Sequence, residues 1–192
     1  MANCDGLISS GITLDCNDIN AAIGVGKDLI LFNYEDYDKE ATLAPSNIEQ
    51  DDSNNNEGGL STIFFKSGAT PYTFEGTEYS VQPTISTEVK EDGDSWFIHS
   101  ILFTCYNKSS KARVTLEELG GARVIAVLRD RSTGFQELLG SDQGLKISAL
   151  DRAYVGAQTS NFYQVTIVTP DIAVVREGNL GYLASTDYTI AT

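Results

Sequence analysis

Strand-like segments follow one another at short intervals along most of this chain, and this spacing constrains the fold more than any other feature. Apolar and polar residues alternate at 84–89 and at 162–169, as they do when one face of a strand is buried. The pair Asp92-Gly93 stands just after the first of these segments and is a strong signal for a tight hairpin turn. The chain is therefore expected to be mainly β, an antiparallel β-sandwich or barrel.

The other expected strands are shorter and are bounded by turn-forming residues. Residues 96–106 are apolar enough on both faces for the centre of a sheet. Residues 12–14 fit a short strand or an extended arm, residues 42–49 are expected to extend again, and the chain is expected to end in a polar tail. The remaining expected strands are 28–34, 62–65, 71–74, 79–81, 123–129, 135–139, 145–150 and 173–175.

One helix is expected, at residues 109–119, packed on the side of the sheets. Its candidate N-caps are Asn107, Ser109 and Ser110. Its apolar side is formed by Val114, Leu116 and Leu119. Gly120-Gly121 is expected to end the helix by adopting positive φ. With no internal repeat and no sharp linker, the 192 residues are expected to form a single domain.

The negative charge is concentrated in the first hundred residues. Residues 1–60 hold 12 Asp and Glu against 2 Lys and Arg, residues 61–100 hold 6 against 2, and residues 101–192 hold 9 against 9, which gives −10, −4 and 0. An acidic surface repels phosphate backbones, because nucleic-acid affinity comes mainly from Lys and Arg. Tight binding of nucleic acid or of an anionic membrane is therefore not expected.

Few residues are available for metal or acid–base chemistry. The lone His99 lies in an apolar segment, where a hydrogen-bonded core residue is the ordinary interpretation. The chain has three cysteines, Cys4, Cys16 and Cys105, and this odd number indicates a reducing compartment. Their spacing does not match the paired spacing of metal-binding cysteines. Residues 1–14 contain neither a basic residue nor a long apolar run, so no signal peptide is expected. No catalytic residue, cofactor, metal or membrane span is predicted.

Two acidic segments are interpreted as loops rather than metal sites. Residues 51–59 contain only polar residues and glycine, and the calcium-loop pattern that starts at Asp52 lacks the required glycine and glutamate. The hairpin tip at Asp92 and Gly93 forms the second segment. The first loop is a candidate for contacts between copies of the chain, through Asp51, Asp52, Asn54, Asn55, Asn56 and Glu57.

A chain with many strands must protect its open sheet edges. Residues 35–95 form a long acidic excursion before the stronger strands that follow, and they are expected to reach a neighbouring copy as a hairpin arm. Identical copies joined by a rotating contact close into a ring and leave no edge open.

The sequence resembles the tail tube proteins of tailed bacteriophages of Bacteroidetes-type hosts. The resemblance covers about half of the chain. At the N-terminus it rests on Cys4-Asp5-Gly6, on the stretch from Gly11 to Cys16, on Gly24, Gly26 and Lys27, and on Leu29 to Phe32. Further along it rests on Val114 to Leu119, Arg123 to Leu128, Phe135 to Leu145 and Phe162 to Val168.

This resemblance implies a sandwich with a flanking helix that assembles into hexameric rings. The rings would stack through long loops and an N-terminal arm, at about residues 1–27, to form the tail tube of the virion, assembled in the host cytoplasm. Genomic DNA would pass through the channel without adhering, other tail proteins would be partners, and some carboxylates of residues 1–100 would face the channel. The family has no catalytic residues.

Several alternatives stay open. The acidic segment 35–59 departs from the family, which leaves open a tube-end protein such as a tail terminator or a tube-initiating ring component. A separate alternative is another assembly component, namely a head–tail connector, a baseplate ring or a capsid decoration protein. A β-sandwich module that binds glycans or proteins would use exposed aromatic residues such as Tyr72, Phe74 and Tyr79. An enzyme is not expected, because no nucleophile, base and orienting group can be recognised together.

Overall fold

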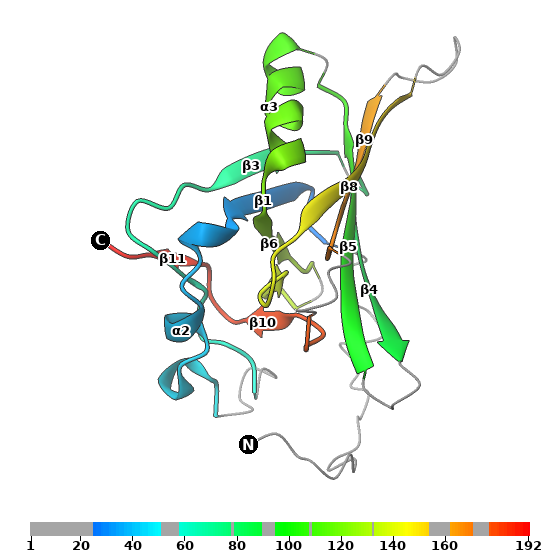
Figure 1. The fold of residues 1–192 in the computed structure, drawn as a ribbon. Helices are drawn as coiled ribbons and strands as arrows, with labels where there is room; N and C mark the ends of the chain where they lie inside the picture. Colours follow the sequence, from blue (N-terminus) through cyan, green and yellow to red (C-terminus); the bar gives the residue numbers. More distant parts are fainter. Residues whose placement is uncertain are drawn as a thin grey trace.

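The computed structural model describes residues 25–50, 58–77, 79–89, 95–107, 109–131, 133–153, 162–170 and 177–192. Within these residues the protein is mainly β, with two antiparallel sheets and one long helix at their side (Figure 1). The expected fold class, an antiparallel β-sandwich with one flanking helix, is confirmed.

The first sheet has five antiparallel strands, and its central strand is buried on both faces. In spatial order the strands are β10 (Tyr182–Ala184), β7 (Gln136–Leu139), β6 (Val124–Arg129), β1 (Asp28–Asn33) and β3 (Tyr72–Glu75). The first five residues of β6 are all buried, as their unbroken apolar run indicates. The predicted hairpin between β6 and β7 is present, with Gly134 N bonded to Asp130 O at 2.9 Å in its turn.

The second sheet has four strands that are antiparallel to their neighbours. They are β4 (Val81–Val89), β5 (Ser95–Cys105), β9 (Phe162–Val168) and β8 (Lys146–Ala153), in that order. The predicted central position of the 96–106 segment is confirmed, because β5 pairs on both sides. The two faces of β5 differ in burial. From His99 to Cys105 only alternate residues are buried, and the other face carries Trp96, Ile98 and Leu102 together with Ser100 and Thr104, all partly exposed.

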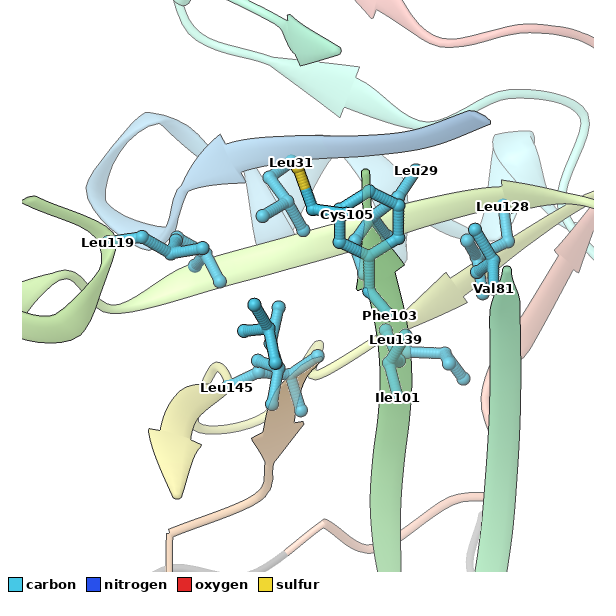
Figure 2. Packing of buried hydrophobic residues seen from close by; sticks show 14 of the residues in the cluster. Leu29, Leu31, Val81, Ile101, Phe103, Cys105, Leu119, Leu128, Leu139 and Leu145 are labelled. Atoms are coloured by element: carbon cyan, nitrogen blue, oxygen red, sulfur yellow. The ribbon is translucent and has the colours of Figure 1, made fainter. Parts of the chain in front are cut away.

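The main core fills the space between the two sheets. Leu29 and Leu31 of β1 point toward Ile101 and Phe103 of β5, and Leu119 closes one end (Figure 2). Burial of such side chains stabilises the fold by about 1.5–3 kcal/mol each. The two sheets are held together mainly by this layer.

A second core covers the opposite face of the five-stranded sheet. The rings of Phe32 and Phe65 are stacked with centroids 3.7 Å apart, and Tyr188 meets Phe32 edge-on. Phe65 belongs to β2 (Phe64–Phe65), which pairs in parallel with β11 (Thr189–Ile190). Neither β10 nor β11 was expected, because these strands have only three and two residues and lie among polar and glycine residues that were interpreted as a tail.

The described part of the acidic excursion packs against its own chain. Thr42 and Asn47 are buried, and the Thr42 hydroxyl accepts a hydrogen bond from Phe64 N at 3.0 Å. The expected extension of residues 42–49 is wrong, since α2 (Lys39–Thr42) and a 3-10 turn (Pro45–Asn47) form there. Asp38 caps α2 by accepting from Ala41 N at 3.0 Å, which favours the helical turn. Another 3-10 turn (Tyr34–Asp36) precedes it.

The long helix α3 (Ser110–Gly121) confirms the predicted helix and its cap. Ser109 is the N-cap, and its hydroxyl accepts from Ala112 N at 3.1 Å. Leu116 and Leu119 are buried, whereas Val114 is 53% exposed. The predicted glycine stop is wrong. Gly120 and Gly121 stay in the last turn without positive φ, and the chain leaves the helix through extended Ala122.

Residues 79–89 also differ from the expectation. Tyr79 has a φ of +63° and lies in a turn, and the strand begins at Val81. The two expected strands at 79–81 and 84–89 are therefore one strand, β4. Its pairing with β5 runs to Val89 opposite Ser95, as a hairpin requires, while the predicted tip at Asp92-Gly93 lies outside the described residues.

Candidate functional site

The four-stranded sheet turns one whole face away from the core. Cross-strand pairing places its members in rows, for example Thr84, Ser100, Val168 and Lys146. We call this face the outer face. Its described members are Gln82, Thr84, Ser86, Glu88, Trp96, Ile98, Ser100, Leu102, Thr104, Lys146, Ala149, Asp151, Phe162, Gln164, Thr166 and Val168.

The outer face mixes polar and apolar residues and carries little charge. Seven of its sixteen described members have hydroxyl or amide side chains, and six are apolar. Its charged groups are Glu88, Asp151 and Lys146, a net charge of −1. A face of this kind resembles neither a protein core nor a nucleic-acid site, where Lys and Arg are concentrated.

Both margins of this sheet are open in the part of the chain that the structure describes. There, β4 pairs only with β5, and β8 pairs only with β9. The two edge strands have nine and eight residues, long for edges without a partner. Long unpaired edges are templates for pairing with another chain, so these margins are the candidate functional site.

The backbone groups of β4 and β8 point outward at alternate residues. Thr104 N donates to Ser80 O at 2.8 Å, so the even-numbered residues of β4 bond to β5 and the odd-numbered ones face the open edge. Pro83, which has no N–H, lies among the odd-numbered residues, the side on which an edge strand tolerates proline.

The same alternation can be followed across the sheet to the other edge. Thr169 N donates to His99 O at 2.9 Å, so the odd-numbered residues of β9 bond to β5 and the even-numbered ones bond to β8. On β8 this leaves Ile147, Leu150 and Arg152 with outward-facing backbone groups. A bulge at Ser148 lies between the first two.

The two hairpins of the sheet are displaced along the strands. The β4–β5 hairpin extends toward one end of the molecule and the β8–β9 hairpin toward the other (Figure 1). Ser100 of β5 pairs with Val168 of β9. The residues of β5 that precede Ser100 pair with β4 but not with β9. A cavity of about 580 Å³ lies in the resulting notch, between Trp96 and Lys146.

Glu177 connects this part of β5 to the turn after β7 through its backbone and its buried carboxylate. Glu177 is fully buried, and its backbone oxygen accepts from Phe97 N at 3.0 Å. Its carboxylate accepts from Asp142 N at 3.0 and 3.1 Å and from Gln143 N at 3.0 Å, in the turn after β7. Burial raises the pKa of Glu177 above its ordinary value, and these amide hydrogen bonds oppose the shift.

Asp142 adds a second set of contacts at the same turn. Its carboxylate forms an ion pair with Lys39 and accepts from Gly178 N at 2.8 Å. Burial acts to raise the pKa of Asp142, but the hydrogen bonds and the Lys39 charge outweigh it, so the pKa lies below its ordinary value. Together Glu177 and Asp142 join the segment after residue 176, α2 and the turn between the two sheets.

His99 is a buried structural residue, as predicted. Its Nδ1 accepts from Gly140 N at 3.1 Å, so its Nε2 donates to Asn179 O at 2.8 Å. This pattern requires the neutral ring, and burial lowers the pKa of His99 below its ordinary value of 6.5. The histidine therefore connects β5 to the first sheet and to the C-terminal segment.

Replacement of His99 by phenylalanine is expected to lower the free energy of unfolding by about 2 kcal/mol, because Gly140 N and Asn179 O lose their partners inside the protein. The pH dependence should change as well. As pH falls below 6.5, the unfolded histidine gains a proton that the folded one resists, so the wild-type protein loses stability. Denaturant titrations between pH 7.5 and 5.5 should show this decline in wild type and not in His99→Phe. An equal decline in both would contradict the assignment.

The loop predicted to mediate contacts lies outside the described part of the chain, and its residues are Asp51, Asp52, Asn54, Asn55, Asn56 and Glu57. The predicted hairpin tip at Asp92 and Gly93 and the cysteines Cys4 and Cys16 lie outside it as well. Cys105 is described and buried, with a free thiol. Of the aromatic residues considered for binding, Tyr72 and Tyr79 are exposed, whereas Phe74 packs edge-on against Phe103.

No group of three or more His, Cys, Asp or Glu residues suited to a metal ion occurs among the described residues. No helix in the same residues is long and apolar enough to cross a membrane. No family model, curated protein or solved structure matches the chain.

The sequence pattern did not reveal the sheet margins or the Glu177 contacts. An alternating strand has the same pattern at an edge as in the centre, so the edge position of β4 and β8 depends on topology. Pro83 was a usable signal, because proline within a strand is confined to edges. Glu177 lies in a polar segment and has no such signal.

Proposed function

We propose that this protein is a structural subunit of a bacteriophage tail tube, which forms rings by joining its four-stranded sheet edge to edge with further copies. The observation that carries the proposal is that the long edge strands β4 and β8, on opposite sides of one sheet, are both open in the described part of the chain. Protein edges of this length are normally covered or shortened. Pairing with copies of the same chain would cover both at once.

The strand directions suit such a ring. Neighbouring strands in this sheet are antiparallel, and the number of strands is even, so β4 and β8 run in opposite directions. When copies are related by rotation, β4 of one copy meets β8 of the next in an antiparallel pair. This contact is heterologous, and it closes a ring whose sheets form one continuous barrel.

The outer face then lines the channel, because the core and α3 lie on the other side of the sheet. Six copies, the number that the resemblance implies, would give about 24 strands and a barrel about 45 Å across at about 4.8 Å between strands tilted by about 36°. With Lys146 as its one described cation, this wall offers few groups that can hold a phosphate backbone.

The outer face carries fewer carboxylates of residues 1–100 than the resemblance implies for a channel wall. Glu88 is the one described acidic residue of the first hundred that lies on the outer face. Glu35, Asp36 and Glu40 belong to the region around α2, on the side of the second core. Passage of DNA without adhesion is therefore attributed to scarce positive charge and weak negative charge in the wall.

Negative-stain electron microscopy of the purified protein over a range of concentrations tests this function. A tube subunit should give rings at low concentration and hollow filaments at high concentration. Single rings that never stack would favour a connector, a terminator or a baseplate ring. A particle that stays monomeric at millimolar concentration would contradict the proposal in all these forms.

A further inference from the structure

We propose that neighbouring copies join in one register, in which Glu88 on β4 lies opposite Lys146 on β8 of the next copy. This inference rests on the proposed function and specifies the contact that the ring requires. It follows from the displacement of the two hairpins, the direction of the backbone groups and the charges along the two edges.

The displacement can be counted along the rows of the sheet. Within one copy, Thr84 of β4 lies in the same row as Lys146 of β8, through the intervening Ser100 and Val168. Glu88 lies four residues further along β4, since 88 − 84 = 4. Placing Glu88 opposite Lys146 of the next copy therefore staggers the copies by four residues.

Only even staggers preserve the faces of the sheet. The even-numbered residues of β4 and residues 146, 149 and 151 of β8 share the outer face. An odd stagger would place outer-face residues of one copy beside core-facing residues of the next. An even stagger also brings together backbone groups that both point outward, such as those of Ile85 and Leu150, whereas Pro83 also faces outward but has no N–H to donate.

Among the even staggers, four residues gives the longest ladder. Lys146 is then opposite Glu88, Ala149 is opposite Ser86 and Ala153 is opposite Gln82, so the whole of β8 lies along β4. With a stagger of two residues Ala153 extends beyond Val81, the first residue of β4, and has no partner there. With a stagger of six residues Lys146 extends beyond Val89, the last residue of β4.

Barrel geometry favours the same value. Four residues of stagger for every four strands make the total shear equal to the number of strands. The eight-stranded barrel with a shear of eight has this ratio, and its strands are tilted by about 36°. A stagger of two residues would halve the ratio and give a tilt well below the range of about 35–45° found in closed barrels.

The charged side chains of the two edges also favour the four-residue stagger over the others. Only the four-residue stagger places the carboxylate of Glu88 opposite the ammonium group of Lys146. An exposed pair of this kind contributes about 0.2–1 kcal/mol, so it helps to select the register rather than to hold the ring together.

Disulfide cross-linking of assembled protein can determine the register directly. Four double variants combine Ala149→Cys with Gln82→Cys, Thr84→Cys, Ser86→Cys or Glu88→Cys, which report staggers of zero, two, four and six residues. Cys4→Ser and Cys16→Ser form the common background, and Cys105 is buried. Within one copy β4 and β8 are three strand spacings apart, about 14 Å, beyond the reach of about 7 Å for a disulfide.

Mild oxidation followed by non-reducing electrophoresis should give a ladder of covalent oligomers for Ser86→Cys with Ala149→Cys. The other three variants should give at least tenfold less. A ladder from another pair in rings visible by electron microscopy would overturn the register and leave the proposed function standing. Rings with no ladder from any pair would overturn the β4–β8 contact, and the absence of rings in the wild-type protein would overturn both.

Discussion

Replacement of Thr87 by proline is expected to prevent assembly while the individual chain stays folded. The backbone N–H of Thr87 faces the open edge of β4, so proline there removes no hydrogen bond to β5. It does remove a donor from the contact with the next copy and adds a ring at the point of approach. The loss of one buried hydrogen bond costs about 2 kcal/mol per contact.

That cost weakens each contact about 30-fold, and it recurs at every contact of a closed ring. Sedimentation velocity should therefore show a monomer at concentrations where wild type forms rings, and circular dichroism should be unchanged. Thr87→Val is the matched control, since it keeps the N–H and a β-branched side chain, and it should assemble normally. If Thr87→Pro forms rings as wild type does, β4 is not a contact strand.

Replacement of Phe65 by alanine is expected to lower the free energy of unfolding by about 3–5 kcal/mol. The Phe65 side chain is 1% exposed and stacked on Phe32, so its removal leaves a cavity and ends an aromatic pair. This effect tests whether residues 58–77 belong to the folded body. A mobile arm would lose almost nothing from the same change.

Urea denaturation monitored by fluorescence of the single tryptophan, Trp96, measures this loss. The control is Tyr72→Ala, in a side chain that is 46% exposed, with an expected change below about 0.5 kcal/mol. A change below about 1 kcal/mol for Phe65→Ala would show that the second core contributes little. The conclusion that the acidic excursion packs on its own chain would then fail.

The parts of the fold that could be predicted from the sequence are those set by local patterns. The alternation in β9, the apolar run of β6 and the Ser109 cap each depend on residues close in the chain. The run of β6 is buried on both faces because two cores lie against it, which the sequence indicates through five apolar residues in succession.

The parts that could not be predicted depend on distant partners. β2 and β11 have two residues each, and they are strands only because they pair across more than a hundred positions of sequence. Residues 42–49 contain apolar residues at spacings that suit either a strand or a turn, and the cap by Asp38 and the burial of Asn47 favour the turns. The candidate site has the same limitation, because an edge is a property of the assembled sheet.

Residue-resolved amide hydrogen exchange on β4, in isolated and assembled protein, tests the central claim most directly. In the isolated chain the amides of Thr84 and Ser86 should be protected by β5, whereas those of Ile85 and Thr87 face the open edge and should exchange quickly. Assembly should slow exchange at Ile85 and Thr87 by at least about 100-fold. Unchanged exchange at these two amides in assembled particles would contradict the claim that copies of this chain complete its sheet.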